Sequence, residues 1–249
     1  MVLVWLTAGV TLQALEPGQL YTRGSAELKR IALSFDDGPG PETPRFLAML
    51  DRNGVKATFF VLGEAVELRG ALVREIVERG HEVASHSSTH RNYLQHVRSL
   101  AAGRSAAAAE DQARRDLLAD LQRTHLAIQR AGGVDVRLLR MPHGIDRPWI
   151  KTAAREMGYA LINWTYGADW QSGSAEQLLP GYLSALQPGA IFLFHDGGRN
   201  RSKSLQLAEA VIRSAQQQGY EIVTVGQLLG ATPTWKRDFR VDARPATSG

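Results

Sequence analysis

Short apolar runs alternate with amphipathic stretches along most of this chain. Each apolar run is rich in β-branched, aromatic or aliphatic residues, which predicts a strand, and each following stretch has apolar residues at helical spacing. The expected strands are 31–35, 57–61, 82–85, 137–140, 160–163, 190–194 and 220–223. The expected helices are 43–53, 64–79, a long helix after a mobile stretch at 101–109, 148–157, 175–186, 204–218 and 225–229. Seven strand–helix units of similar length predict an α/β fold, a parallel sheet closed or nearly closed into a barrel.

The two ends of the chain fall outside this alternation. Residues 1–30 begin with the uncharged run MVLVWLTAGVTLQAL, too short to span a bilayer, and continue as a polar linker. We expect that run to be the remnant of an export signal or membrane anchor, which predicts a secreted, periplasmic or envelope protein. If the run is instead an ordinary first strand or helix, a cytoplasmic location is also compatible with the sequence. Residues 31–230 are the expected domain, and residues 231–249 a loosely held tail.

The residue types present restrict the chemistry of any site. The chain has no cysteine, which excludes disulfides, thiolate metal sites and a cysteine nucleophile. A metal would need His, Asp or Glu ligands, which suit zinc or a similar divalent ion. The formal net charge is +4, and the Lys and Arg residues are scattered along the chain. We therefore expect a solvated basic surface and no nucleic-acid partner.

Polar residues gather just after the expected strands. Asp36 and Asp37 follow the first strand, and two adjacent carboxylates are costly unless a cation or a proton lies between them. His86 and His90 follow the third strand, with a spacing that places two imidazoles on one helical turn. The remaining residues of this kind are Arg140, Trp164, Asp169, Trp170, His195 and Asp196. Because active sites of parallel barrels lie at the carboxyl ends of the strands, these side chains are expected to share one face.

Each of these features has a plainer explanation when taken alone. Asp36 and Asp37 suit an acidic turn, His86 and His90 a polar helix cap, and His195 a hydrogen-bonded core position. Their common face favours a catalytic metal set of two histidines and one carboxylate, which leaves positions for water. Opposite such a centre, a histidine with a pKa near neutrality is suited to donate a proton.

Five motifs occur in order, at residues 34–39 (SFDDGP), 86–90 (HSSTH), 140–144 (RMPHG), 169–170 (DW) and 193–196 (LFHD). By these motifs the chain resembles the polysaccharide deacetylases with a NodB homology domain, carbohydrate esterase family four, over about residues 31–229. The resemblance implies a distorted, TIM-like (β/α)7 barrel. It also implies metal-dependent removal of N- or O-acetyl groups from an acetylated polysaccharide or oligosaccharide, in modification of a cell wall or an exopolysaccharide.

The resemblance further assigns roles to residues of this chain. The metal ligands would be Asp37, His86 and His90, and the metal would most often be zinc. Asp36 would be the general base, held in position by Arg140, and His195 the general acid. The residues facing the substrate would be His143 through its backbone N–H, Asp169, Trp170 on the groove wall and Leu193 at the acetyl methyl group.

The chain departs from the family pattern in three places. His143 stands where an aromatic residue is usual. Gly167 lies near the place of an earlier aspartate that tunes the acid histidine, which puts the tuning of His195 in question. The segment 94–130 is longer than the family needs, and we predict that it shapes the substrate groove.

Two other functions stay open at this point. The same centre would serve an amidase or deformylase acting on a small or lipid-linked sugar. A glycan-binding relative without catalysis would be expected to lack a ligand or the acid, whereas Asp36, Asp37, His86, His90, Arg140 and His195 are all present. We expect a monomer.

Overall fold

A computed structural model describes residues 15–231, so most of the predicted export segment and almost all of the predicted tail lie outside the described residues. Its strands are β1 (Leu20–Tyr21), β2 (Arg30–Gly38), β3 (Thr58–Val61), β4 (Glu82–Ser85), β5 (Leu138–Leu139), β6 (Ala160–Ile162), β7 (Ile191–His195) and β8 (Glu221–Val223). Its α-helices are α1 (Thr43–Arg52), α2 (Gly63–Glu78), α3 (Tyr93–Leu100), α4 (Ala106–Gly132), α5 (Pro148–Glu156), α6 (Ala175–Ser184), α7 (Ser202–Gln217) and α8 (Val225–Leu228). Within the described part of the chain, no helix is both long and apolar enough to cross a bilayer.

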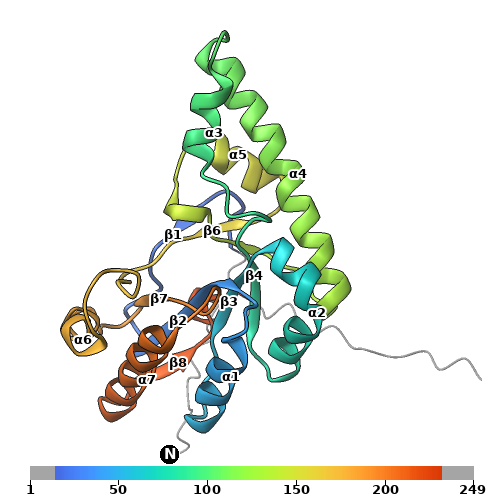
Figure 1. The fold of residues 1–249 in the computed structure, drawn as a ribbon. Coiled ribbons are helices and arrows are strands. Elements are labelled where there is room, and N and C mark those ends of the chain that lie inside the picture. The colour runs from blue at the N-terminus through green and yellow to red at the C-terminus, as the bar shows by residue number, and fades with distance from the viewer. Residues whose placement is uncertain (1–14, 232–249) are drawn as a thin grey trace, which may run out of the picture.

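All strands pair in parallel, in the order β1-β6-β5-β4-β3-β2-β7, with β8 also paired to β2. The two ends of this curled sheet approach each other through single bridges, Tyr166 with Phe192 and Arg23 with Ala190. The Leu193 amide donates to the Tyr166 carbonyl at 2.9 Å across this seam. The helices surround the sheet (Figure 1). The predicted distorted barrel is thus confirmed, with irregular backbone in place of a full strand pair at the seam.

Two parts of the chain differ from the prediction. The predicted linker contains β1, whose Leu20 pairs with Leu161 of β6, so the folded domain begins before residue 31. A strand of two residues carries no periodic pattern, so β1 could not be predicted from the sequence. The segment 94–130 forms most of a helical hairpin, α3 and α4, which extends away from the sheet (Figure 1). Ser105 caps α4 by accepting from the Ala108 amide at 3.2 Å.

Alternation along β2 separates two apolar layers. Ile31, Leu33 and Phe35 pack with the surrounding helices, whereas Ala32 packs inside the barrel with residues such as Phe60. Because side chains alternate along a strand, the inward series that begins with Ala32 continues through Ser34 to Asp36. Asp36 is therefore directed into the barrel at the carboxyl end of β2.

Left-handed backbone brings the neighbouring ligand candidates to the same place. Asp37 has a φ of 71° and lies where the register between β2 and β3 shifts, so its side chain does not turn to the outer face as strict alternation would require. Ser87 and His90 also have positive φ, at 65° and 55°. The segment 86–90 is therefore a loop and not the helical turn that the spacing of His86 and His90 indicated.

Candidate active site

A cavity of about 310 Å³ opens at the carboxyl ends of the strands. Its lining consists of Asp36, Asp37, His86, His90, Met141, His143, Gly144, Trp164, Trp170, Leu193 and His195. The structure thus brings together all but three of the site residues singled out in the sequence. The exceptions are Arg140, Asp169 and Asp196, which are buried and are not among the lining residues. No residue of 94–130, a segment that the structure describes throughout, lines this cavity. That this segment shapes a wider substrate groove stays a prediction.

Asp36 is held by a fully buried arginine. Arg140 is 0% exposed and Asp36 is 2% exposed, and Arg140 Nη1 donates to Asp36 Oδ1 at 2.7 Å. The same guanidinium donates to Ser34 Oγ at 2.9 Å and stacks 4.0 Å from the Phe60 ring. Burial raises the pKa of Asp36 above its ordinary value, and the Arg140 charge opposes this. The carboxylate is thereby fixed in one orientation with Oδ2 left for the cavity.

Asp37, His86 and His90 form a compact cluster whose ligand atoms lie within 4.8 Å of one another. Asp37 Oδ1 is 3.6 Å from His86 Nε2 and 3.4 Å from His90 Nε2. No other group of three or more His, Cys, Asp or Glu residues in the described chain meets the same criterion. These distances are too long for direct hydrogen bonds and leave space for an atom between the three groups.

The protonation of His86 fits a metal at this position. His86 Nδ1 lies 2.7 Å from the Arg140 carbonyl, which only accepts, so Nδ1 carries the hydrogen. Burial lowers the pKa of His86 to about 3, so the ring is neutral and Nε2 directs a lone pair at Asp37. Asp37 Oδ1 is buried and has no hydrogen-bond partner among the described residues. Two facing lone pairs without a proton between them are what a cation satisfies, and a histidine whose second nitrogen donates to a carbonyl is typical of metal sites.

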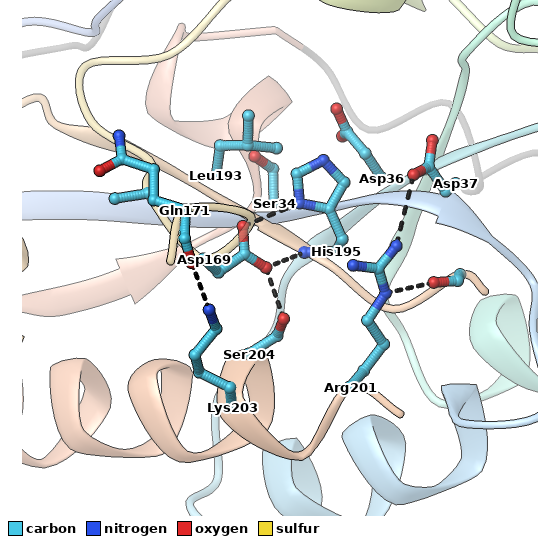
Figure 2. Close-up of polar contacts among 12 residues, drawn as sticks. Ser34, Asp36, Asp37, Asp169, Gln171, Leu193, His195, Arg201, Lys203 and Ser204 are labelled. Carbon is cyan, nitrogen blue, oxygen red and sulfur yellow. Dashed lines mark hydrogen bonds and ion pairs between the residues drawn. The ribbon is translucent and has the colours of Figure 1, made fainter. Parts of the chain in front are cut away.

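His195 is supported from behind by Asp169, as Figure 2 shows. Asp169 is 3% exposed; its Oδ1 is 2.8 Å from His195 Nδ1 and its Oδ2 accepts from the His195 amide at 2.8 Å. Ser204 Oγ donates to the same Oδ2 at 2.5 Å. Burial lowers the pKa of His195, but the Asp169 hydrogen bond and charge, with Asp36 and Asp37, outweigh it and raise that pKa.

These contacts bear on two points raised about the segment after β6. Asp169 was expected to face the substrate, yet both of its oxygens are engaged with His195 and Ser204 below the cavity surface. The question that Gly167 raised about the tuning of His195 is answered by Asp169, which itself contacts His195 Nδ1 at 2.8 Å. The Gly167 site has no space for a side chain, since a Cβ there would lie 2.8 Å from Leu193 Cβ.

An aromatic wall borders the cavity on the side of His195. Trp170 is 51% exposed, and its ring meets the His195 ring edge-on at 5.5 Å and Trp164 at 6.3 Å. Across the cavity, the His143 ring lies 4.8 Å from the His90 ring. His143 has a φ of 61°, so the turn that carries it is tight and its backbone amide position is fixed by the fold.

Three residues at the start of α7 escaped the sequence analysis (Figure 2). Besides Ser204, Lys203 Nζ donates to the Gln171 carbonyl at 2.5 Å, and Arg201 Nη2 lies 3.7 Å from Asp37 Oδ2. The contacts of these residues depend on the path of the loop between β7 and α7, which no local sequence pattern predicts. The only feature of the sequence that could have pointed to them is the run of polar residues after Asp196.

The family model described as polysaccharide deacetylase matches residues 23–162. Among curated proteins, the peptidoglycan-N-acetylglucosamine deacetylase PgdA of Listeria monocytogenes is 33% identical over 204 residues, 81% of this chain and 39% of that protein. The chain therefore spans well under half the length of this relative. The chitooligosaccharide deacetylase of Sinorhizobium fredii is 34% identical over 170 residues, 67% of this chain and 72% of that protein.

Solved structures with a similar fold are also deacetylases or members of the CE4 family. The Bc1960 peptidoglycan N-acetylglucosamine deacetylase has a TM-score of 0.73 at 26% identity, covering 87% of this chain and 95% of that one. The Xyl-CE4 domain of a multidomain xylanase from the hindgut metagenome of Trinervitermes trinervoides has a TM-score of 0.69 at 31% identity, covering 84% and 94%. BA3943, a CE4 family pseudoenzyme from Bacillus anthracis, has a TM-score of 0.70 at 26% identity, covering 85% and 69%.

Proposed function

The chain belongs to the polysaccharide deacetylase family, and on that basis we propose that it hydrolyses acetyl groups from N-acetylated or O-acetylated sugars of a glycan. The observation that carries the proposal is the unsatisfied Asp37 Oδ1, which faces two imidazole nitrogens beside the arginine-held Asp36. A site built only for structure would pair that buried oxygen with a donor. His195, register partner of Asp36 across β2 and β7, completes an acid and base pair at one cavity.

Asp37, His86 and His90 would hold a divalent ion, and this donor set of two imidazoles and one carboxylate suits zinc best. When bound, the ion polarises the acetyl carbonyl and lowers the pKa of water, so that water becomes a usable nucleophile near neutral pH. His86 presents Nε2 because the Arg140 carbonyl holds its other nitrogen.

Asp36 would act as the general base. Its Oδ1 is occupied by Arg140, which leaves Oδ2 to accept a proton from the attacking water. Burial raises the pKa of Asp36, which favours proton uptake, and the Arg140 hydrogen bond holds the carboxylate in one orientation.

His195 would act as the general acid. Because Nδ1 is bound to Asp169, Nε2 is the nitrogen left to give a proton to the leaving amine or alkoxide. The C–N or C–O bond of the acetyl group then breaks, and the products are acetate and the free amine or hydroxyl. We propose that the backbone amide near His143, which lines the cavity, donates to the carbonyl oxygen as that oxygen gains charge.

We propose that Trp170 and Leu193 contact the sugar and the acetyl methyl group, since both line the cavity beside His195. Relatives are named for N-acetylglucosamine in peptidoglycan and for chitooligosaccharides, so N-acetylglucosamine in a β-linked glycan is the substrate class we propose. Such a polymer belongs to the cell envelope or its surroundings, which is where we place the protein, as a monomer.

Acetate release tests this proposal. Metal-stripped protein is incubated with N-acetylglucosamine oligomers with and without added zinc, and acetate and free amines are counted. We expect acetate and free amine in equal amounts, and only when metal is added. The reason is that Asp37, His86 and His90 would activate water only through a bound ion. Zinc binding without release from any acetylated glycan would contradict the proposal and leave a small-molecule amidase or a non-catalytic glycan-binding relative.

Replacing Asp169 with asparagine is expected to move the alkaline limb of the pH–rate profile to lower pH. His195 must be protonated to act as an acid, so the rate falls as the pH rises through its pKa, and the Asp169 charge raises that pKa. The measurement is kcat/KM for an N-acetylglucosamine oligomer between pH 6 and 10. Asp116→Asn is the matched control, because Asp116 pairs with His96 at 2.7 Å outside the cavity. An unmoved alkaline limb in Asp169→Asn would count against His195 as the acid.

A further inference from the structure

Arg201 contacts the oxygen of Asp37 that the two histidines do not face. Arg201 Nη2 lies 3.7 Å from Asp37 Oδ2, and Arg201 Nε donates to the Gly197 carbonyl (Figure 2). The opposite oxygen, Oδ1, is 3.4 Å from His90 Nε2. Both side chains of the ion pair are 23% exposed, so the pair is well shielded from water. The two oxygens of the Asp37 carboxylate thus face different partners, Oδ1 the imidazoles and Oδ2 the guanidinium.

The loop after β7 is shaped to bring this guanidinium to Asp37. Gly197 lies against the Asp37 backbone so closely that a Cβ there would be 2.0 Å from the Asp37 carbonyl oxygen. Gly198 has a φ of 82° and Asn200 a φ of 54°, which turn the chain back before Arg201. The Gly197 carbonyl then anchors Nε, so the fork of the guanidinium has little freedom to leave the carboxylate.

The two adjacent carboxylates of the site therefore have separate arginines. Arg140 serves Asp36, and its other donors go to Ser34 Oγ and to the Ile162 and Asn163 carbonyls. Arg140 has no contact with Asp37 among its hydrogen bonds and ion pairs, whereas Arg201 does. Among the described residues, no other lysine or arginine makes an ion pair with Asp37, so without Arg201 the Oδ2 side of the carboxylate would lose its cationic partner.

We propose that Arg201 is a positioning residue for the metal ligand Asp37. It holds Oδ2 so that Oδ1 alone is presented to a divalent ion, in line with His86 and His90. This rests on the proposed function, since it assumes that these three residues bind metal. Partners that orient a ligand in this way typically change metal affinity by about 10–100-fold when removed.

The test compares Arg201→Met, Arg201→Lys and Arg213→Met with the wild type. Arg213 is the matched control, because it lies on the same helix and makes an exposed ion pair with Glu209 at 3.8 Å. Zinc affinity is measured by competition with a chromogenic chelator, and bound cobalt is followed by its visible absorption, which reports the coordination number and geometry of the ion. The melting temperature of each metal-free protein is recorded alongside.

We expect Arg201→Met to bind zinc about 10–100-fold more weakly than the wild type and to shift the cobalt absorption, with Arg201→Lys intermediate and Arg213→Met unchanged. Wild-type affinity and an unshifted cobalt spectrum in Arg201→Met would overturn the proposal, as would an equal loss in Arg213→Met. If Arg201→Met does not fold, Arg201→Lys carries the same comparison. A wild type that binds no zinc would instead overturn the proposed function, so the two failures are distinguishable.

Discussion

Replacing Asp36 with asparagine is expected to lower the rate of acetate release by about 10²–10⁴-fold, the contribution typical of a positioned general base. The amide keeps the shape of the side chain and can still accept from Arg140 Nη1, which now donates to Asp36 Oδ1 at 2.7 Å. It cannot take a proton from water. The loss should therefore appear in kcat with little change in KM, as for an interaction made only in the transition state.

Two controls separate this loss from damage to the site. Zinc affinity of Asp36→Asn should stay close to that of the wild type, because Asp36 is not among the three grouped ligand candidates. Glu82→Gln is a matched variant, since Glu82 accepts from Thr58 Oγ1 at 2.7 Å and from the Gly226 amide at 2.9 Å, away from the cavity lining. It should keep its activity. A fully active Asp36→Asn protein with zinc bound would exclude Asp36 as the base.

Replacing Arg140 with methionine is expected to lower the free energy of unfolding by about 3–5 kcal/mol, the usual cost of removing one partner of a buried ion pair. Arg140 is fully buried and holds Asp36, Ser34 Oγ and two backbone carbonyls. Without it, burial of Asp36 is opposed only by the charge of His195, so the pKa of Asp36 rises further. A raised folded-state pKa of a carboxyl means that stability falls as the pH rises above the unfolded value, so the defect should be larger at pH 8 than at pH 4.

Urea denaturation at both pH values, with midpoint and slope fitted together, measures this change. The double variant Asp36→Asn with Arg140→Met should be less destabilised at pH 8 than the sum of the two single variants, because the unpaired charge is gone. Arg137→Met is the control, since Arg137 pairs with Asp135 at an exposed position and should cost less than about 1 kcal/mol. A loss in Arg140→Met no larger than this control would show that the buried pair does not stabilise the fold.

The position of the site was predictable from the sequence because it depends on a general property of parallel barrels. The apolar runs fix the strands, and the carboxyl ends of parallel strands converge, so Asp36 and His195 had to approach each other once β2 and β7 paired. The barrel itself followed from the repeated alternation. Neither inference required any side-chain detail.

The contacts behind the cavity were not predictable in the same way. Asp37 enters the site only because a φ of 71° overrides strand alternation, and His90 only because its loop is left-handed rather than helical. An aspartate at position 169 could either face the substrate or support His195, and the sequence alone does not distinguish these two roles. Burial decides between these roles, and burial depends on how the loop packs on α7.

Residues 201–204, the N-cap and first residues of α7, make three separate contacts that support the site. Arg201 contacts Asp37, Lys203 binds the backbone of the segment carrying Trp170, and Ser204 contacts the aspartate behind His195. A rigid-body shift of this helix would move all three together and preserve their mutual alignment, whereas a change in the helix start would misalign all three at once. Natural variation should therefore accumulate along the outer face of α7, while residues 201–204 should vary together.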